Sequence, residues 1–158
     1  LANYWLHNEF ININKEKIDF ADSIIALTCG VGVQAVSSVI DKYVHPANNT
    51  IYLGGFQGTW PSQERCAECG DCVLDWTGGI CPITNCSKSL LNGSCGGAKN
   101  GKCEIDKELD CGWENIYNRL KKLNKLENLQ KQVKLRDYSK MFPNKELRNT
   151  TFYDVEKE

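Results

Sequence analysis

Cys66-Ala-Glu-Cys69-Gly-Asp-Cys72 opens the stretch that decides how this chain can fold. Residues 66–111 hold eight of the chain's nine cysteines together with seven glycines, and very few Leu, Ile, Val or Phe residues. A segment with so little apolar surface cannot offset the entropy cost of its own ordering by burial alone. We therefore expect disulfides, zinc or iron–sulfur clusters to hold it in place.

The first three cysteines follow the pattern Cys-x-x-Cys-x-x-Cys, which places three thiolates on one tight loop. This geometry suits three corners of a [4Fe–4S] cluster whose fourth ligand comes from elsewhere, and bacterial ferredoxin motifs of this shape end in Cys-Pro. Cys81-Pro82 supplies a Cys-Pro nine residues after Cys72, a longer spacing than in a ferredoxin. The pattern predicts an iron–sulfur site.

The four cysteines that remain in the stretch are enough for a second site, and they are Cys86, Cys95, Cys103 and Cys111. Eight thiolates fit two [4Fe–4S] clusters, or one cluster plus a tetrahedral zinc. Because ligands interleave along the chain in two-cluster folds, the spacing does not assign cysteines to sites. Taken alone, the later four could bind zinc as readily as iron.

A disulfide framework in a secreted protein is the structural alternative. Several Asn-x-Ser/Thr patterns match glycosylation acceptors, but such patterns are frequent in an Asn-rich chain. An odd total of nine cysteines, in a sequence where no signal peptide is visible, opposes this alternative. We therefore favour ligation of metal by thiolates.

The net charge and the hydropathy of the chain argue against nucleic-acid binding and against a membrane span. The chain has 158 residues, a formal net charge of −1 and a pI near 6.2, so no electrostatic footprint for nucleic acid is present. No apolar run approaches the length of a membrane span, and we expect a soluble, cytoplasmic protein. Since the sequence begins with Leu1 rather than Met, we expect a longer chain that was truncated or processed.

An α/β unit is predicted before the cysteines. The apolar run at residues 23–28 indicates a buried strand. A helical pattern follows until His45-Pro46, and residues 50–53 indicate a second strand. Strand, helix and strand imply a right-handed crossover between parallel strands.

The turn after the first strand contains Cys29 and Gly30-x-Gly32. A dinucleotide site would need a third glycine and an acidic residue after the second strand, so we expect these glycines to serve close packing instead. Cys29 lies at the carboxyl end of the strand, where α/β sheets place their ligands. It could be a further cluster ligand, a functional thiol near a cluster or a buried small hydrophobe.

Amphipathic helices are predicted after the cysteines. Between residues 111 and 123 an apolar stripe recurs at helical spacing, formed by Trp113, Ile116, Tyr117, Leu120 and Leu123. A shorter pattern follows through Leu126, Leu129 and Val133.

The predicted fold class is α/β: a small βαβ, Rossmann-like unit, a cysteine-rich metal-cluster module and C-terminal amphipathic helices. We place the partial α/β unit at 1–55, the iron–sulfur module at 56–111, the helices at 112–135, and a polar tail or docking arm at 136–158.

Several motifs together resemble the MetV-like family, the small metal-binding subunits of methylenetetrahydrofolate reductase complexes in acetogenic and related anaerobes. The same module occurs as the methylenetetrahydrofolate reductase C-terminal domain. The motifs include Ala26-Leu-Thr-Cys29-Gly-Val-Gly-Val-Gln34, Glu64-Arg-Cys66-Ala-Glu-Cys69-Gly-Asp-Cys72, Thr77-Gly-Gly-Ile-Cys81-Pro-Ile-Thr84 and Asp110-Cys111-Gly-Trp113. Family members usually carry a further N-terminal portion with its own cysteines, and residues 1–158 do not include it.

The resemblance implies electron transfer in one-carbon metabolism. In such complexes a MetF-type subunit, an FMN-containing TIM barrel, reduces methylenetetrahydrofolate to methyltetrahydrofolate, and the MetV-like subunit relays electrons to the flavin; further electron-input subunits are compatible with this. The present chain is too short for a barrel of about 250 residues and shows no acid–base constellation.

We therefore expect a non-catalytic accessory subunit with two [4Fe–4S] clusters, held by the eight cysteines of residues 66–111. The alternatives are one cluster plus zinc, or a zinc-binding structural subunit without a redox role.

Overall fold

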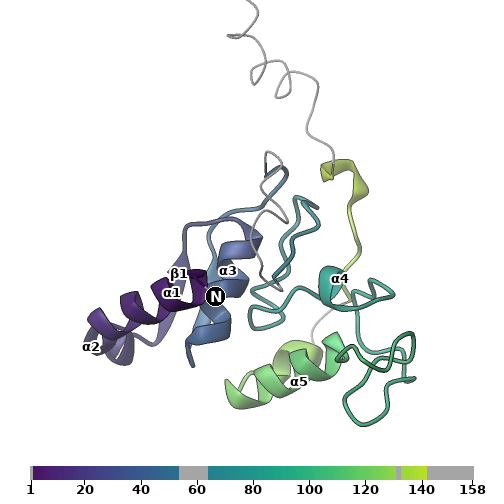
Figure 1. Ribbon diagram of the computed structural model, residues 1–158. Coiled ribbons are helices and arrows are strands. Elements are labelled where there is room, and N and C mark those ends of the chain that lie inside the picture. The colour runs from purple at the N-terminus through teal and green to yellow at the C-terminus, as the bar shows by residue number, and fades with distance from the viewer. Residues whose placement is uncertain (1, 54–63, 131–132, 142–158) are drawn as a thin grey trace, which may run out of the picture.

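The computed structural model describes residues 2–53, 64–130 and 133–141 (Figure 1). Its helices and strands are short and are joined by long loops, above all between residues 64 and 111. In chain order they are α1 (Ala2–Ile13), α2 (Lys15–Phe20), β1 (Ser23–Ala26), α3 (Gly30–Val39), β2 (Tyr43–Pro46), α4 (Pro82–Asn85), α5 (Gly112–Lys122) and the 3-10 helices η1 (Leu126–Gln130) and η2 (Tyr138–Lys140). None of the described helices is long and apolar enough to cross a bilayer.

The predicted parallel βαβ unit is confirmed, with its second strand at a different place. β1 pairs in parallel with β2, in a register that runs from Ser23 opposite Tyr43 to Ala26 opposite Pro46. Our placement of the second strand at 50–53 was wrong, because the helix ends early at Val39 and Ile40 is already extended. Pro46 ends the strand rather than a helix, which suits a residue without an N–H group.

Two apolar clusters form the core. The first joins the α/β unit to the cysteine-rich loops and contains Ala26, Val33, Val44, Leu74, Cys81 and Ile83. The second lies under α5 and contains Cys111, Trp113, Ile116 and Leu120. Each cluster includes at least one cysteine, so the thiols are placed by packing against aliphatic and aromatic neighbours. The cysteine-rich loops therefore share their core with both flanking units.

The amphipathic helix predicted after Cys111 is α5, and most of its stripe is buried. Trp113, Ile116 and Leu120 face the core, whereas Tyr117 is 47% exposed. The next apolar pattern forms the 3-10 helix η1 rather than an α-helix, and Val133 is 67% exposed. Asn124 has a left-handed φ of 53°, a conformation that ends a helix, so α5 does not continue into this second apolar pattern.

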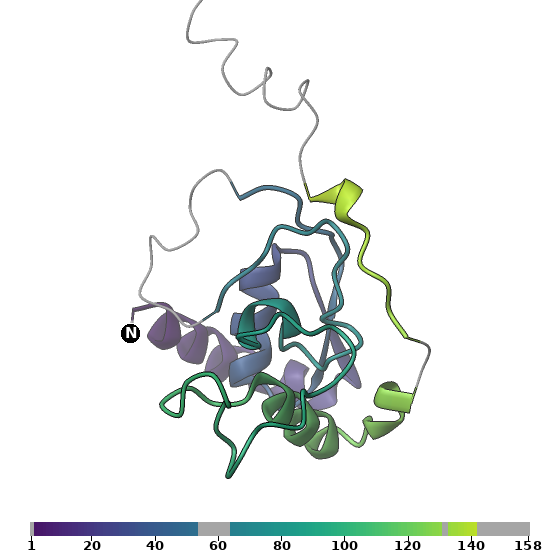
Figure 2. The same cartoon turned by 90° about the vertical axis from the view of Figure 1, so that its right-hand side faces the viewer.

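The described part of the polar C-terminal segment lies along the chain itself. Residues 133–141 run from the η1 side back toward the loop at residue 70, as Figure 2 shows. The Asn92 side chain makes two hydrogen bonds with the Lys134 backbone: its Nδ2 donates to the Lys134 carbonyl, and its Oδ1 accepts from the Lys134 N–H. Lys140 lies against the first cysteine loop, with its Nζ 3.8 Å from Asp71 Oδ1. The rest of the predicted tail, from 142 onward, is outside the described residues.

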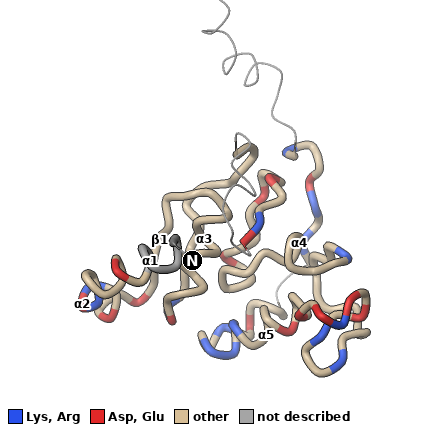
Figure 3. The backbone as a smooth tube through the Cα atoms, viewed as in Figure 1, with Lys and Arg blue, Asp and Glu red and all other residues tan. Residues whose placement is uncertain are grey.

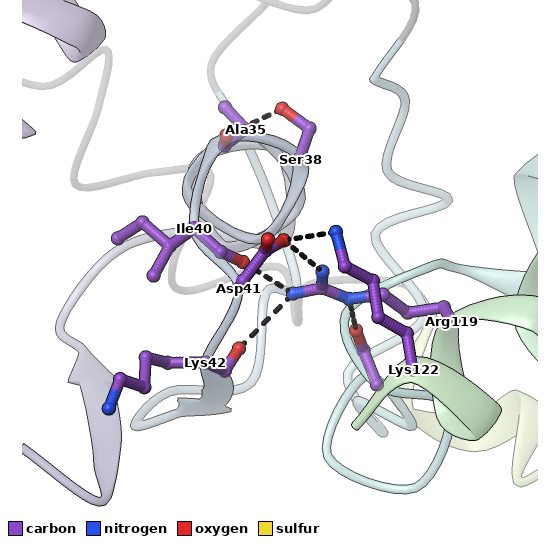
Figure 4. A network of polar contacts seen from close by, with 8 residues as sticks. Ala35, Ser38, Ile40, Asp41, Lys42, Arg119 and Lys122 are labelled. Atoms are coloured by element: carbon purple, nitrogen blue, oxygen red, sulfur yellow. Dashed lines mark hydrogen bonds and ion pairs between the residues drawn. The ribbon is translucent and has the colours of Figure 1, made fainter. Parts of the chain in front are cut away.

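One buried cation ties α5 to the α/β unit (Figure 4). The Arg119 side chain is 12% exposed, and its Nη2 donates to the carbonyl oxygens of Ile40, at 2.8 Å, and Lys42, at 3.1 Å. Its Nε donates to the Gly78 carbonyl at 3.2 Å, and its Nη1 lies 3.7 Å from Asp41 Oδ1. One guanidinium therefore joins three segments that are far apart in the sequence.

Replacing Arg119 by Met should lower the free energy of unfolding by about 2–3 kcal/mol, because three part-buried carbonyl groups would lose a charged donor. Urea unfolding followed by tryptophan fluorescence measures the loss. The matched control is Lys122→Met: Lys122 also pairs with Asp41, at 2.6 Å, but its side chain is 59% exposed, so its loss should cost less than about 1 kcal/mol. Equal losses in the two variants would contradict the structural role of Arg119.

Candidate functional site

Four cysteines line one cavity between α3 and the loop that follows residue 64. They are Cys66, Cys69, Cys72 and Cys81, and we call this group the first thiol site. Gly30 and Gln34 of α3 form one wall of the cavity, and Leu74 and Ile83 form an apolar floor. The structure thus brings the Cys-x-x-Cys-x-x-Cys motif and the Cys-Pro cysteine together in one cavity.

The loop of the first thiol site turns tightly because two of its residues adopt left-handed backbone conformations. Glu68 has a φ of 52° and Gly70 a φ of 66°, a region that non-glycine residues seldom occupy. The Gly70 N–H donates to the Thr50 carbonyl at 2.9 Å. On the opposite wall a Cβ on Gly30 would lie 2.9 Å from Cys66 Sγ. Close approach to this thiol, rather than nucleotide binding, therefore explains the first glycine of the turn.

A buried amide holds the first thiol site together. Gln34 is 5% exposed, and its Nε2 donates to the carbonyl oxygens of Arg65, at 2.7 Å, and Gly30, at 3.0 Å. Its Oε1 accepts from the Cys81 N–H at 3.2 Å. Gln34 thus connects α3 to the residue before Cys66 and to Cys81 itself. Its role was not predicted from the sequence, although a polar residue among the apolar positions of a helix was a usable signal.

The other four cysteines line a second cavity, beside α5. They are Cys86, Cys95, Cys103 and Cys111, and we call this group the second thiol site. Cys86 follows α4 and Cys111 precedes α5, while Cys95 and Cys103 lie on the intervening loop. The Cys111 N–H donates to the Gly101 carbonyl at 2.7 Å and the Cys103 N–H to the Leu109 carbonyl at 2.9 Å. The two sites therefore do not interleave, which the spacing could not establish.

The short helix α4 connects the two thiol sites. Cys81 lies immediately before it and Cys86 immediately after it. Asn85, its last residue, lines the second cavity and donates from Nδ2 to the Cys81 carbonyl at 2.9 Å. The Asn85 carbonyl also packs against the start of α5, where a Cβ on Gly112 would meet it at 2.5 Å. One helical turn therefore sets the relative position of the sites.

Backbone N–H groups approach sulfur atoms in both sites, each from the residue two positions after a cysteine. The Glu68 N–H lies 3.4 Å from Cys66 Sγ, and the Gly97 N–H lies 3.4 Å from Cys95 Sγ. The Leu74 N–H interacts with Cys72 and the Ile105 N–H with Cys103, and each lowers the pKa of its thiol. Donors of this kind stabilise thiolate over thiol, which is the form that binds metal.

Burial distinguishes the two sites. Burial raises the pKa of the Cys66 thiol above its ordinary value, and it raises that of Cys72 to about 11. In the second site a hydrogen bond with Ser87, whose Oγ lies 3.5 Å from Cys103 Sγ, lowers the pKa of Cys103. Two cysteines of the first site, Cys66 and Cys81, are buried, whereas the second site combines the buried Cys111 with the exposed Cys95.

All nine cysteines are free thiols in the structure, so no disulfide framework holds the loops. Within the described residues, no three His, Cys, Asp or Glu side chains are gathered closely enough to hold a single metal ion. Zinc would need four sulfurs at about 2.3 Å from one centre, whereas the thiolates of a [4Fe–4S] cluster bind different irons and stand farther apart. The described residues therefore present no preformed zinc site.

Cys29 lies outside both groups. It immediately precedes α3 and is partly exposed, whereas its neighbour Gly30 lines the first cavity. Of its three predicted roles, that of a fully buried small hydrophobe is wrong. His45 also lies outside both thiol sites. It pairs with Asp75, and both residues line a different cavity.

Comparison with known proteins yields one family. Residues 45–139 match the family described as methylene-tetrahydrofolate reductase C terminal. The matched region contains both thiol sites, α4, α5 and Arg119, and it begins within β2. No curated protein and no solved structure matches the chain.

The metal-free, reduced chain should show a difference in thiol reactivity between the sites. Because the pKa of Cys72 is about 11, its alkylation by iodoacetamide should rise about tenfold per pH unit from pH 7 to pH 10. Cys103, whose pKa is lowered, should approach its plateau at a lower pH than Cys72. Mass spectrometry of the labelled peptides measures both rates, and urea-unfolded protein is the control. Equal rates in the folded chain would contradict the difference in burial.

Proposed function

The chain belongs to the methylene-tetrahydrofolate reductase C-terminal family, and on this premise we propose that it is an iron–sulfur electron-transfer subunit of a methylenetetrahydrofolate reductase. It would relay electrons to the flavin of a MetF-type catalytic subunit, which converts methylenetetrahydrofolate to methyltetrahydrofolate. The family association itself places the chain with methylenetetrahydrofolate reductase; the relay role is the proposal.

The observation that supports the relay best is the division of eight cysteines into two separate groups of four. Each group has the number of thiolates that a [4Fe–4S] cluster takes. Cys66, Cys69, Cys72 and Cys81 would hold the first cluster and Cys86, Cys95, Cys103 and Cys111 the second. When bound, such clusters accept and donate single electrons. The alternative is zinc in one or both sites, since four thiolates also make a tetrahedral zinc site.

The arrangement of the backbone supports transfer within the chain. Cys81 and Cys86 flank the single helical turn of α4, so only four residues separate a cysteine of one site from a cysteine of the other. Asn85 contacts the Cys81 carbonyl and lines the second cavity, so a covalent and hydrogen-bonded path joins the sites. The chain's own role is to hold two electron-carrying groups close together and to exclude water from one of them.

The carbon chemistry would lie elsewhere. Reduction of a methylene to a methyl group requires two electrons and a proton donor beside the substrate. The residues that line the thiol sites are cysteines, small residues and apolar residues, with Lys88, Glu104 and Asp71 as the charged members. This composition suits cluster binding, and the flavin-bearing partner would supply the acid–base groups.

Iron, zinc and acid-labile sulfide analysis of anaerobically purified protein tests the proposal. We expect about eight irons with matching sulfide per chain and a brown colour. Cys69→Ala and Cys103→Ala should each remove about four irons, because each variant lacks a ligand of only one site. Each should also slow electron delivery to the partner flavin.

Cys29→Ala is the matched control, since Cys29 lies outside both cavities; its iron content should equal that of the unmodified chain. Zinc alone, without iron or sulfide, would overturn the electron relay and leave a structural subunit. Loss of all eight irons in Cys69→Ala, with the fold intact by circular dichroism, would contradict the independence of the two sites.

A further inference from the structure

Two charged side chains lie directly against one thiol of the second site. Glu104 Oε2 is 3.7 Å from Cys95 Sγ, and Glu104 Oε1 forms an ion pair with Lys88 Nζ. Lys88 also interacts with Cys95, and both partners raise the pKa of its ammonium group. Both charged residues line the second cavity together with its four cysteines. The ion pair is therefore part of the wall of this site.

The backbone is adapted to hold Glu104 in this position. A Cβ on Gly97 would lie 1.2 Å from Glu104 Oε2, so any other residue at this position would displace the carboxylate from its place over the Cys95 loop. The same Gly97 donates its N–H to Cys95 Sγ at 3.4 Å. Figure 3 shows acidic and basic residues alternating along the loop before α5. Within that loop, Glu104 is distinguished by its carboxylate, which lies close to the sulfur of Cys95.

In the first thiol site, only one member of an ion pair lines the cavity. Among the described residues that line its cavity, Asp71 is the only charged one, and its nearest described cation is Lys140, at 3.8 Å. Apolar residues supply most of the remaining wall, including Leu74 and Ile83. The two sites thus present different electrostatic surroundings to groups of the same kind.

We propose that Lys88 raises and Glu104 lowers the reduction potential of the second site, as opposed charges beside Cys95. The proposal rests on the proposed function, because it requires a redox group at the second site. One-electron reduction adds one negative charge to that site, and the electron comes from the external donor of the complex or, in a titration, from dithionite. A nearby ammonium stabilises the reduced form and raises the potential, whereas a nearby carboxylate lowers it.

The experiment is a potentiometric titration of the loaded chain, poised with dithionite and redox mediators and followed by electron paramagnetic resonance. The signal that disappears in Cys103→Ala identifies the second site and its midpoint reduction potential. Lys88→Met should shift this midpoint downward and Glu104→Gln upward. The double variant should return close to the unmodified value, and Lys88→Arg should keep it.

Controls of equal charge change are Lys99→Met and Glu108→Gln, whose side chains are exposed on the same loop and do not line the cavity. They should move the midpoint much less. The first site is an internal reference, and its midpoint should stay constant in every variant.

Shifts of the same sign in Lys88→Met and Glu104→Gln, or shifts no larger than in the controls, would overturn the inference while leaving the relay intact. Zinc at the second site beside iron at the first would also overturn it. Absence of iron from both sites would instead show that the proposed function had failed.

Discussion

The side-chain amide of Gln34 is the contact on which the arrangement of the cysteine-rich loops depends. It uses both of its ends at once, donating to the carbonyls of Arg65 and Gly30 and accepting from the Cys81 N–H. These loops contain too few apolar residues to fold on their own core. A helix of the α/β unit therefore supplies both the polar anchor and, through Val33, part of the apolar floor. Loss of such a buried amide leaves several backbone groups without partners, which costs more than the bonds themselves contribute.

Arg119 anchors α5 as Gln34 anchors the cysteine-rich loops, through hydrogen bonds to backbone carbonyl groups. Its guanidinium binds carbonyl groups of the α3–β2 turn and of Gly78, so α5 cannot move relative to the α/β unit without breaking charged hydrogen bonds. Since Cys111 precedes α5 directly, this anchor also fixes one ligand position of the second site. The two thiol sites are thus held by two long polar side chains, one from each flanking helix, and α4 spans the distance between them.

The sequence predicted features that depend on local pattern. The Cys-x-x-Cys-x-x-Cys motif with Cys81, the parallel βαβ unit and the buried stripe of α5 each follow from spacing that neighbouring residues determine. The second strand was misplaced because Tyr43 and Val44 continue the apolar pattern of the helix, and only pairing with β1 decides between the two structures. Gln34 and Arg119 could not be assigned from sequence, because the contacts that tie them to other segments lie 31 or more residues away and are mostly to backbone atoms, which carry no residue-type signal. The division of the cysteines into sites was likewise a matter of three-dimensional packing.

The two thiol sites differ in their surroundings, a difference that the sequence alone does not reveal. A redox group with low-polarity surroundings resists the addition of negative charge, whereas one beside an ammonium and near solvent accepts it more readily. The first site lies against Leu74 and Ile83, whereas the second is lined by Lys88 and Glu104, whose effects on a reduction potential oppose each other. On the proposed function, the low-polarity walls would therefore make the group at the first site the harder one to reduce, and electrons would rest at the second site.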